Sequence, residues 1–225
     1  ELLLGTVTNT QDITGEVLEQ KPANVSKEQL ETVLAQFMGP QQQVPPMYSA
    51  VKIGGRKLYE LARKGQSVER KPRDIVIHQL ELQEYDGKTA RLRVVCSKGT
   101  YIRTLCHDIG AALGVGGCLA SLRRTRAGIF SIDACVTMEE IQAAREQETH
   151  MALLRPVDSL FSQYPALYLG EKETLRCKNG AENAIPGMPD GSYRVYGPGN
   201  EFLMLGKCQS GVLRTVKSFF EVKEG

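Results

Sequence analysis

The sequence contains no tryptophan and only three histidines among its 225 residues. Its six cysteines are scattered without a Cys-x-x-Cys pair, and none of the histidines has the spacing of metal ligands. These absences predict no metal site and favour reduced thiols in a cytoplasmic protein. No run approaches the roughly 18 apolar residues of a membrane helix, and the first residues do not read as a secretion signal. We therefore expect no membrane association.

Charge is unevenly distributed along the chain. Between Lys52 and Arg73 there are eight basic and two acidic residues, a net charge of +6, and because the whole chain carries +2 the remainder carries −4. A basic segment on a mildly acidic body suits binding to a phosphate backbone. A solvated helix face is the alternative interpretation. Hydrophobic residues make up 41% of the chain, enough for a buried core.

One stretch combines strand-like alternation with reactive side chains. Leu92, Val94 and Cys96 alternate with other residues, and after a break at 97–99 the chain places Tyr101 and Arg103 two positions apart. If the segment stays extended there, both side chains leave the same face. The tyrosine ring could then stack on a base while the guanidinium forks onto a carboxylate or phosphate. A half-buried strand with an arginine reaching to solvent is the alternative.

Residues 97–104, Ser-Lys-Gly-Thr-Tyr-Ile-Arg-Thr, followed by the small-residue segment 108–114, resemble the signature of the TruB family of tRNA pseudouridine synthases. Three other segments agree, in the family's order. Residues 5–15 resemble its threonine- and aspartate-rich turn, residues 45–65 its RNA-gripping insertion, and residues 119–126 the segment that closes its uridine pocket. Together the four segments cover nearly the whole chain.

The pattern of elements predicts an α+β fold with a mixed or antiparallel sheet. Capping boxes at Ser26–Gln29 and Thr137–Glu140 predict two helices, the first running to about Met38. From residue 164 to 225, short strands alternate with Gly/Pro/Asn turns, which is typical of a small β-barrel. The resemblance implies a synthase domain at 1–163 with an insertion at about 44–73, and a PUA-like RNA-binding domain at 164–225.

The resemblance also implies roles for individual side chains. Tyr101 would be the base that removes the C5 proton, or would stack on the flipped uracil. Arg103 would hold the catalytic aspartate, and Asp12 would order the flipped base. Leu122 would wall the uridine pocket, although ordinary core packing explains such a residue equally well. Further substrate contacts would come from Tyr48, Lys52, Arg56, Lys57, Arg123 and Arg124.

The family's nucleophilic aspartate lies in a Gly-x-Leu-Asp-Pro-x-Ala-x-Gly segment, and this sequence contains no such segment. The stretch that begins at Asp12 mimics it only loosely. We therefore expect a fragment whose nucleophile lies upstream of Glu1, and which is inactive alone.

The implied activity is that of a tRNA pseudouridine-55 synthase, which flips a T-loop uridine, breaks its glycosidic bond and rejoins the base through C5. That reaction needs no cofactor. The expected partner is the T-stem-loop of tRNA, and the expected state is a monomer. The alternatives are a non-catalytic RNA-binding module and a pseudouridine synthase subunit of a guide-RNA complex.

Overall fold

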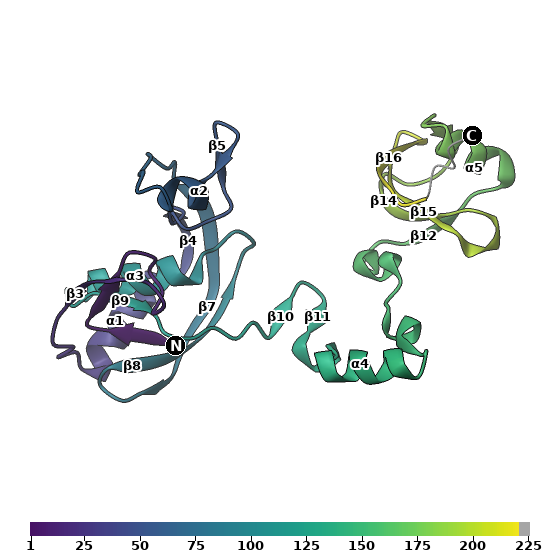
Figure 1. Cartoon of the computed structure of the whole chain (residues 1–225). Helices are drawn as coiled ribbons and strands as arrows, with labels where there is room; N and C mark the ends of the chain where they lie inside the picture. Colours follow the sequence, from purple (N-terminus) through teal and green to yellow (C-terminus); the bar gives the residue numbers. More distant parts are fainter. Residues whose placement is uncertain (221–225) are drawn as a thin grey trace. The chain divides into compact units, whose positions relative to one another are not determined.

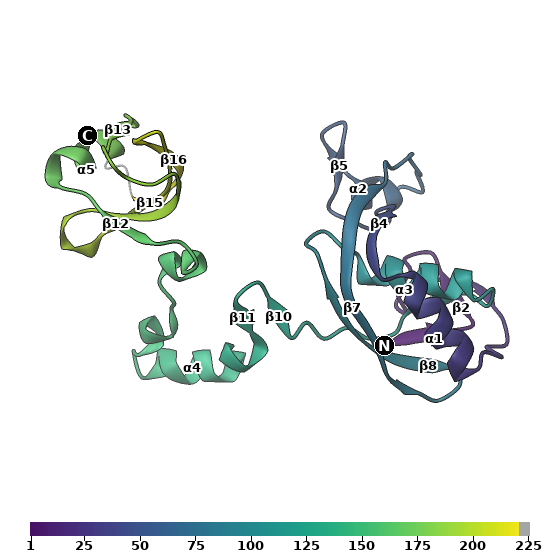
Figure 2. The same cartoon turned by 180° about the vertical axis from the view of Figure 1, so that it is seen from behind.

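The computed structural model describes residues 1–220 and divides the chain into two compact units, Glu1–Arg123 and Arg124–Gly225. Figures 1 and 2 show the elements of each unit from opposite sides. The predicted domain boundary at residue 163 falls just before the first strand of the C-terminal sheet and remains a prediction. Within residues 1–220, no helix combines the length and the apolar character that a membrane span requires.

The first unit is built on a five-stranded sheet in which every neighbouring pair is antiparallel. A long hairpin forms its centre, because strands rich in β-branched residues flank the turn at Asp86–Gly87. The strands, in their order across the sheet, are β4 (Gly39–Gln43), β7 (Arg73–Tyr85), β8 (Thr89–Cys96), β1 (Leu2–Leu4) and β9 (Gly117–Leu119). This confirms the mixed α+β class with antiparallel sheets.

Two helices, α1 (Lys27–Gln36) and α3 (Ile102–Ala112), pack against this sheet. The predicted capping box at the start of α1 is present: the Ser26 hydroxyl accepts from the Gln29 amide at 3.2 Å, and the Gln29 side chain accepts from the Ser26 amide at 2.8 Å. The helix ends two residues earlier than expected. The buried core joins apolar residues of both helices to the strands, with Leu30, Leu34, Leu105 and Ile109 packing near Leu2, Leu4 and Ile77.

The N-terminal residues form two short strands that belong to different sheets. Gly5 adopts a φ of 79°, which turns the chain out of the sheet after β1. The following strand, β2 (Thr6–Thr8), pairs instead with β3 (Val17–Gln20) in a separate two-stranded ribbon. The polar turn between β2 and β3 carries Asp12.

The predicted insertion lies between β4 and β7. It contains the hairpin β5 (Lys52–Ile53) and β6 (Arg56–Lys57), followed by the short helix α2 (Leu58–Ala62). Figure 1 shows these elements gathered beyond the adjacent ends of β4 and β7. Leu58 and Leu61 are buried and anchor α2, whereas most of the charged side chains around them are exposed.

The second unit begins with small elements: β10 (Arg126–Ala127), β11 (Phe130–Ser131), the 3₁₀ turns η1 (Ile132–Ala134), η2 (His150–Leu153) and η3 (Val157–Phe161), and α4 (Met138–Glu146). Helix α4 starts at the predicted capping box of Thr137 and Glu140.

A five-stranded sheet follows, ordered β12 (Ala166–Tyr168), β14 (Gly191–Tyr196), β15 (Phe202–Gln209), β16 (Val212–Ser218) and β13 (Asn183–Ala184), together with α5 (Glu171–Lys178) and the 3₁₀ turn η4 (Pro198–Asn200). Val195, Leu203 and Leu213 are buried in its core. Over the described residues this sheet has β12 and β13 as its edges, so the strand content is confirmed but the closed PUA-like barrel remains a prediction.

Gly110 packs against the turn before β9, and this close approach gives a stability prediction. A Cβ built at Gly110 would overlap the backbone of Gly116 and Gly117, which cannot retreat as a flexible side chain could. We expect Gly110→Ala to lower the free energy of unfolding by about 3 kcal/mol, the upper range for an overpacked site. Urea denaturation followed by circular dichroism measures this. Ala111→Ser, an exposed change on the same helix, should cost only about 0.5 kcal/mol; equal midpoints for the two variants would contradict the prediction.

Candidate active site

Tyr101 and Arg103 lie at the start of α3, so the expectation that both project from one face of an extended segment is wrong. Gly99 adopts a φ of 88° and turns the chain after β8. Tyr101 is the N-cap residue of α3, with extended backbone angles of −95° and 108°, and Arg103 is already inside the helix. Because Tyr101 is extended and Arg103 is helical, their side chains do not follow the two-residue repeat of a strand.

Hydrogen bonds tie this junction to the root of the insertion. The Tyr101 amide donates to Gln43 Oε1 at 2.8 Å, and Gln43 Nε2 donates to the Tyr101 carbonyl at 3.1 Å. Arg103 Nη1 donates to the carbonyl of Tyr48 at 3.3 Å. The structure thus brings three of the sequence-predicted residues, Tyr48, Tyr101 and Arg103, into one contiguous region. Each is partly buried.

Most of the Arg103 guanidinium remains available. Within residues 1–220, Nη1 is the only guanidinium nitrogen that makes a hydrogen bond, and no carboxylate lies within ion-pairing distance of the group. A planar cation with its other donors unengaged can take a carboxylate or phosphate in two-point contact.

The threonine-rich turn is attached to the same helix. Thr104 donates to Gln11 Oε1 at 2.7 Å, and Gln11 itself has a φ of 63°. Asp12 uses one carboxylate oxygen, Oδ1, to accept from the amide and the hydroxyl of Thr14 at 3.0 and 2.7 Å. Its Oδ2 makes no hydrogen bond within residues 1–220. Asp12 therefore holds its own turn together and still presents one acceptor. It forms no hydrogen bond or ion pair with Arg103 in this part of the chain.

Residues 122–124 take no part in the hydrogen bonds described above at the start of α3. The turn that carries Asp12 pairs with Leu119, whose amide donates to the Gln11 carbonyl at 3.0 Å. Three residues later Leu122 is 57% exposed, so the alternative of ordinary core packing is wrong. Arg123 and Arg124 are exposed and, within residues 1–220, form no ion pair. The role of Leu122 as a pocket wall remains a prediction.

Two titratable groups on α3 are shifted by burial. Burial raises the pKa of the Cys106 thiol to about 12, so this thiol stays protonated at neutral pH. Cys106 follows Arg103 by three residues, and its protonation removes it as a candidate nucleophile at this site. Burial also raises the pKa of Asp108, an effect that the neighbouring His107 partly offsets.

The basic side chains of the insertion lack acidic partners. Lys52 and Lys57 face each other across the β5–β6 hairpin, and Arg56 pairs with Ile53 beside the Gly54–Gly55 turn. Elsewhere in unit 1 the exposed cations Arg91 and Arg93 are neutralised by glutamates. Within residues 1–220 none of the eight basic residues between positions 52 and 73 forms an ion pair. The +6 segment is therefore an unneutralised positive surface.

The insertion also contains a groove of about 440 Å³. Its lining combines five apolar residues with four cations and one glutamate. The lining residues are Pro45, Val51, Lys52, Ile53, Leu58, Glu69, Arg70, Lys71, Pro72 and Arg73. Apolar residues together with an excess of cations suit a nucleotide, which presents a flat base and a charged phosphate.

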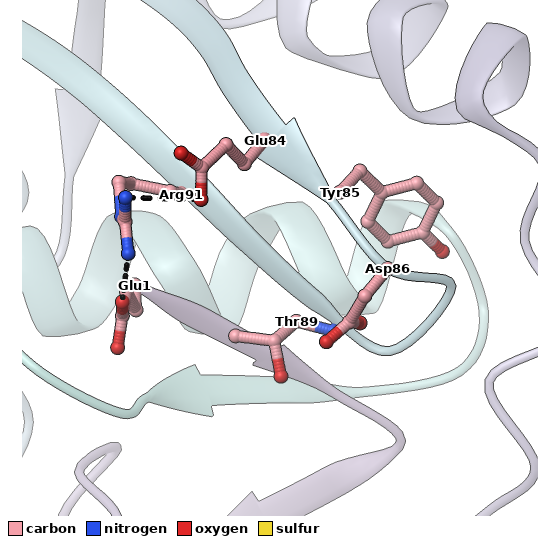
Figure 3. Close-up of a pocket in the computed structure, with 6 residues that line it drawn as sticks. All are labelled: Glu1, Glu84, Tyr85, Asp86, Thr89 and Arg91. Carbon is pink, nitrogen blue, oxygen red and sulfur yellow. Dashed lines mark hydrogen bonds and ion pairs between the residues drawn. The ribbon is translucent and has the colours of Figure 1, made fainter.

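A second, smaller depression lies at the turn of the β7–β8 hairpin, shown in Figure 3. There Arg91 lies between Glu84 and Glu1, with closest nitrogen–oxygen distances of 2.9 and 3.3 Å. Asp86 accepts from the backbone amides of Lys88 and Thr89, which lowers its pKa. Its lining contains three carboxylates (Glu1, Glu84 and Asp86) and one guanidinium (Arg91), so the acidic side chains outnumber the basic one and the depression is a poor candidate for binding an anion.

Sequence reasoning missed two glutamines. Gln43 and Gln11 hold Tyr101 and Thr104 in place, yet neither belongs to a pattern that marks a functional residue. The only sequence signal for Gln43 is its place as the last residue of a short polar strand before Val44-Pro45.

Comparison with known proteins places these features in a family. Residues 1–102 match the model of the TruB family pseudouridylate synthase (N terminal domain), and residues 103–162 match that of the tRNA pseudouridylate synthase B C-terminal domain. A tRNA pseudouridine synthase B from Stutzerimonas stutzeri (strain A1501) is 47% identical over 208 residues, covering 91% of this chain and 68% of the relative. One from Azoarcus sp. (strain BH72) is 46% identical over 211 residues, covering 94% and 70%.

Solved structures agree on the fold. A chain from the Cbf5-Nop10-Gar1 complex aligns with a TM-score of 0.60 and 25% identity over 82% of this chain and 56% of its own length. A chain from an H/ACA RNP bound to a substrate RNA containing 2′-deoxyuridine aligns with a TM-score of 0.64 and 22% identity over 88% of this chain and 62% of its own. The family models and the close relatives, taken with the residues gathered at the start of α3, show that this chain belongs to the TruB family of pseudouridylate synthases.

Proposed function

We propose that this chain forms the tRNA-binding surface and part of the catalytic site of a synthase that converts a T-loop uridine of tRNA to pseudouridine. The observation that carries the proposal is the pairing of a partly buried Tyr101–Arg103 junction with an unneutralised basic insertion rooted beside it. The Tyr101–Arg103 junction can bind a base and a carboxylate, and the basic insertion can bind the phosphates around them.

The isomerisation breaks the N1–C1′ bond and forms a C5–C1′ bond, while C5 loses a proton and N1 gains one. Because the glycosidic bond is shielded inside a stacked helix, the uridine must first be flipped out. Arg103, with most of its donors unengaged, would hold the catalytic carboxylate ionised and oriented. Tyr101 would stack on the uracil or accept the C5 proton, and the free oxygen of Asp12 would fix the flipped nucleotide.

The basic insertion would bind the T-stem-loop backbone. Lys52, Arg56 and Lys57 would contact phosphates from the hairpin, and Arg123 and Arg124 would add contacts near Leu122. We further propose that residues 164–225 act as a PUA-like RNA-binding domain, and that the enzyme works as a cytoplasmic monomer without a cofactor.

The alternative role, as a subunit of a guide-RNA complex, has less support. Relatives named tRNA pseudouridine synthase B reach 47% identity, whereas the aligned chains from RNP assemblies reach 25%. The self-contained basic insertion also favours direct recognition of tRNA without a guide.

Tritium release from [5-³H]uridine in a T-stem-loop RNA tests the proposal, because only loss of the C5 hydrogen liberates the label. Two proteins are compared: the 225-residue chain, and the aspartate-containing enzyme, meaning this chain continuous with an upstream Gly-x-Leu-Asp-Pro-x-Ala-x-Gly segment. Since Arg103 has no carboxylate partner within residues 1–220, the chain should bind the RNA without releasing label, and the aspartate-containing enzyme should release it. Release by the 225-residue chain would contradict the assignment of the missing aspartate; no release by either would contradict the function.

Tyr101→Phe should separate binding from chemistry in the aspartate-containing enzyme. The ring that stacks on the base is kept while the hydroxyl is lost. We expect RNA affinity within about twofold of the parent and a single-turnover rate lower by about 10²-fold, the scale of a lost proton-transfer group. Tyr85→Phe, which removes a β7 hydroxyl that donates to the Val25 carbonyl at 2.9 Å, serves as the control. Parallel losses of affinity and rate in Tyr101→Phe would instead indicate a stacking or folding role.

A further inference from the structure

We propose that Gln43 is a positioning residue that sets the orientation of Tyr101, an inference that rests on the proposed function. Gln43 is the last residue of β4 and is 4% exposed, unusually buried for a side chain of its type. Both polar atoms of its side-chain amide bind the backbone of Tyr101. Oε1 accepts from the Tyr101 amide at 2.8 Å, and Nε2 donates to the Tyr101 carbonyl at 3.1 Å.

The Tyr101 backbone needs such a partner because it lies after the end of β8 and before the first turn of α3. Strand β8 ends at Cys96, and the turn through Gly99 carries the backbone out of the ladder before α3 begins. The amide of an N-cap residue has no partner inside its own helix. The side chain of Gln43 replaces the missing strand neighbour and satisfies a group that would otherwise be partly buried without a hydrogen bond.

The contact does not cap the helix. A helix cap accepts hydrogen bonds from the amides of the first turn, and α3 has no side-chain cap of this kind. Gln43 instead contacts the donor and the acceptor of Tyr101 itself, whose carbonyl also receives the Leu105 amide at 3.0 Å. A single hydrogen bond allows the residue to pivot about it. Two bonds to one residue fix both of its peptide planes, and with them the direction in which its ring projects.

The position of Gln43 also links Tyr101 to the insertion. The chain enters the insertion directly after Gln43, where Arg70 Nη1 donates to the Pro45 carbonyl at 3.1 Å and Arg103 donates to the Tyr48 carbonyl. Residues 43–48 thus contact the catalytic junction at two points and the far end of the insertion at one. RNA bound to the insertion would therefore contact an element that is directly connected to residues 43–48, the segment that orients Tyr101.

Gln43→Met tests the contact, since methionine keeps the length and volume of the side chain and removes both hydrogen bonds. Hydrogen exchange in the 225-residue chain, resolved by NMR, should show the Tyr101 amide exchanging at least about tenfold faster, as expected when one net hydrogen bond is removed. The amides of Leu105 and Ile109 should be unchanged. Gln42→Met is the matched control, because Gln42 is the exposed neighbour on the same strand.

The functional test uses single-turnover kinetics in the aspartate-containing enzyme. Gln43→Met should lower the rate of the chemical step by about 10- to 100-fold, the scale of a small misplacement of a reacting group, with tRNA affinity within about twofold. Should Gln43→Met fail to fold, Gln43→Asn keeps a neutral amide but is one methylene shorter, so it cannot reach both the amide and the carbonyl of Tyr101. It should show faster exchange at the Tyr101 amide and a slower chemical step.

Three results would overturn the proposal. The first is an unchanged exchange rate at the Tyr101 amide in Gln43→Met, which would mean that the two hydrogen bonds between Gln43 and Tyr101 do not form in solution. The second is a rate equal to that of Gln42→Met, and the third is a loss of affinity that matches the loss of rate. Absence of turnover in the parent enzyme is a different failure: it removes the proposed function, while the exchange experiment still decides whether Gln43 holds Tyr101.

Discussion

Replacing Arg103 by lysine should reduce kcat/KM of the aspartate-containing enzyme by about 10²- to 10³-fold, although the charge is kept. In the structure one guanidinium nitrogen, Nη1, is occupied by the Tyr48 carbonyl at 3.3 Å, and the others are unengaged within residues 1–220. A guanidinium can therefore anchor on the insertion root and grip a carboxylate with its remaining donors. A lysine ammonium is a single point that cannot do both in the same geometry.

The effect should appear in the chemical step and not in folding. Arg93→Lys is the control, because Arg93 is an exposed arginine of β8 whose ion-pair partner within residues 1–220 is Glu81, at 3.7 Å. This variant should retain parental kcat/KM. Thermal unfolding of both variants should stay within a few degrees of the parent. Near-parental turnover of Arg103→Lys would show that the two-point grip is not used, and Arg103 would then be a structural link to Tyr48 alone.

The sequence was sufficient to predict the elements that depend on local patterns. Both capping boxes follow from a few neighbouring residues, and both are present at the starts of α1 and α4. The junction at Tyr101 was misjudged because a strand and a helix N-terminus look alike over three residues. The deciding feature is Gly99, whose positive φ turns the chain, and a glycine alone does not reveal which conformation it adopts.

Contacts between distant residues could not be predicted from patterns. Gln43 and Tyr101 are 58 positions apart, and Gln11 and Thr104 are 93 apart. Their pairing depends on how the sheet order β4-β7-β8-β1-β9 brings the ends of strands together. The family resemblance supplied Tyr101 and Arg103 but was silent on the glutamines that hold the region. Leu122 shows the converse limit: in the sequence a pocket wall and ordinary core packing explain this apolar residue equally well, and in the structure it is exposed.

Removing five positive charges from the insertion should weaken tRNA binding by about 10³-fold at low salt, since each phosphate that is no longer bound removes a favourable release of counterions. The variant replaces Lys52, Arg56, Lys57, Arg63 and Lys64 by alanine. These side chains form no ion pair within residues 1–220, so their charges are available to RNA. The slope of log affinity against log salt should fall by about 0.9 for each duplex phosphate that the variant no longer neutralises.

The control must remove the same amount of charge elsewhere on unit 1. Alanine at Lys21, Lys27, Lys88, Arg91 and Arg93 provides it, and four of these five residues are already neutralised by glutamates. Exposed ion pairs contribute about 0–1 kcal/mol each, so the control should fold and should bind tRNA with a nearly parental salt slope. Filter binding between about 50 and 200 mM salt distinguishes the two, because that range changes backbone-dominated affinity steeply. Equal weakening in both variants would mean that only net charge matters, and unchanged binding in the first would move the RNA-binding surface to Arg123, Arg124 and the C-terminal sheet.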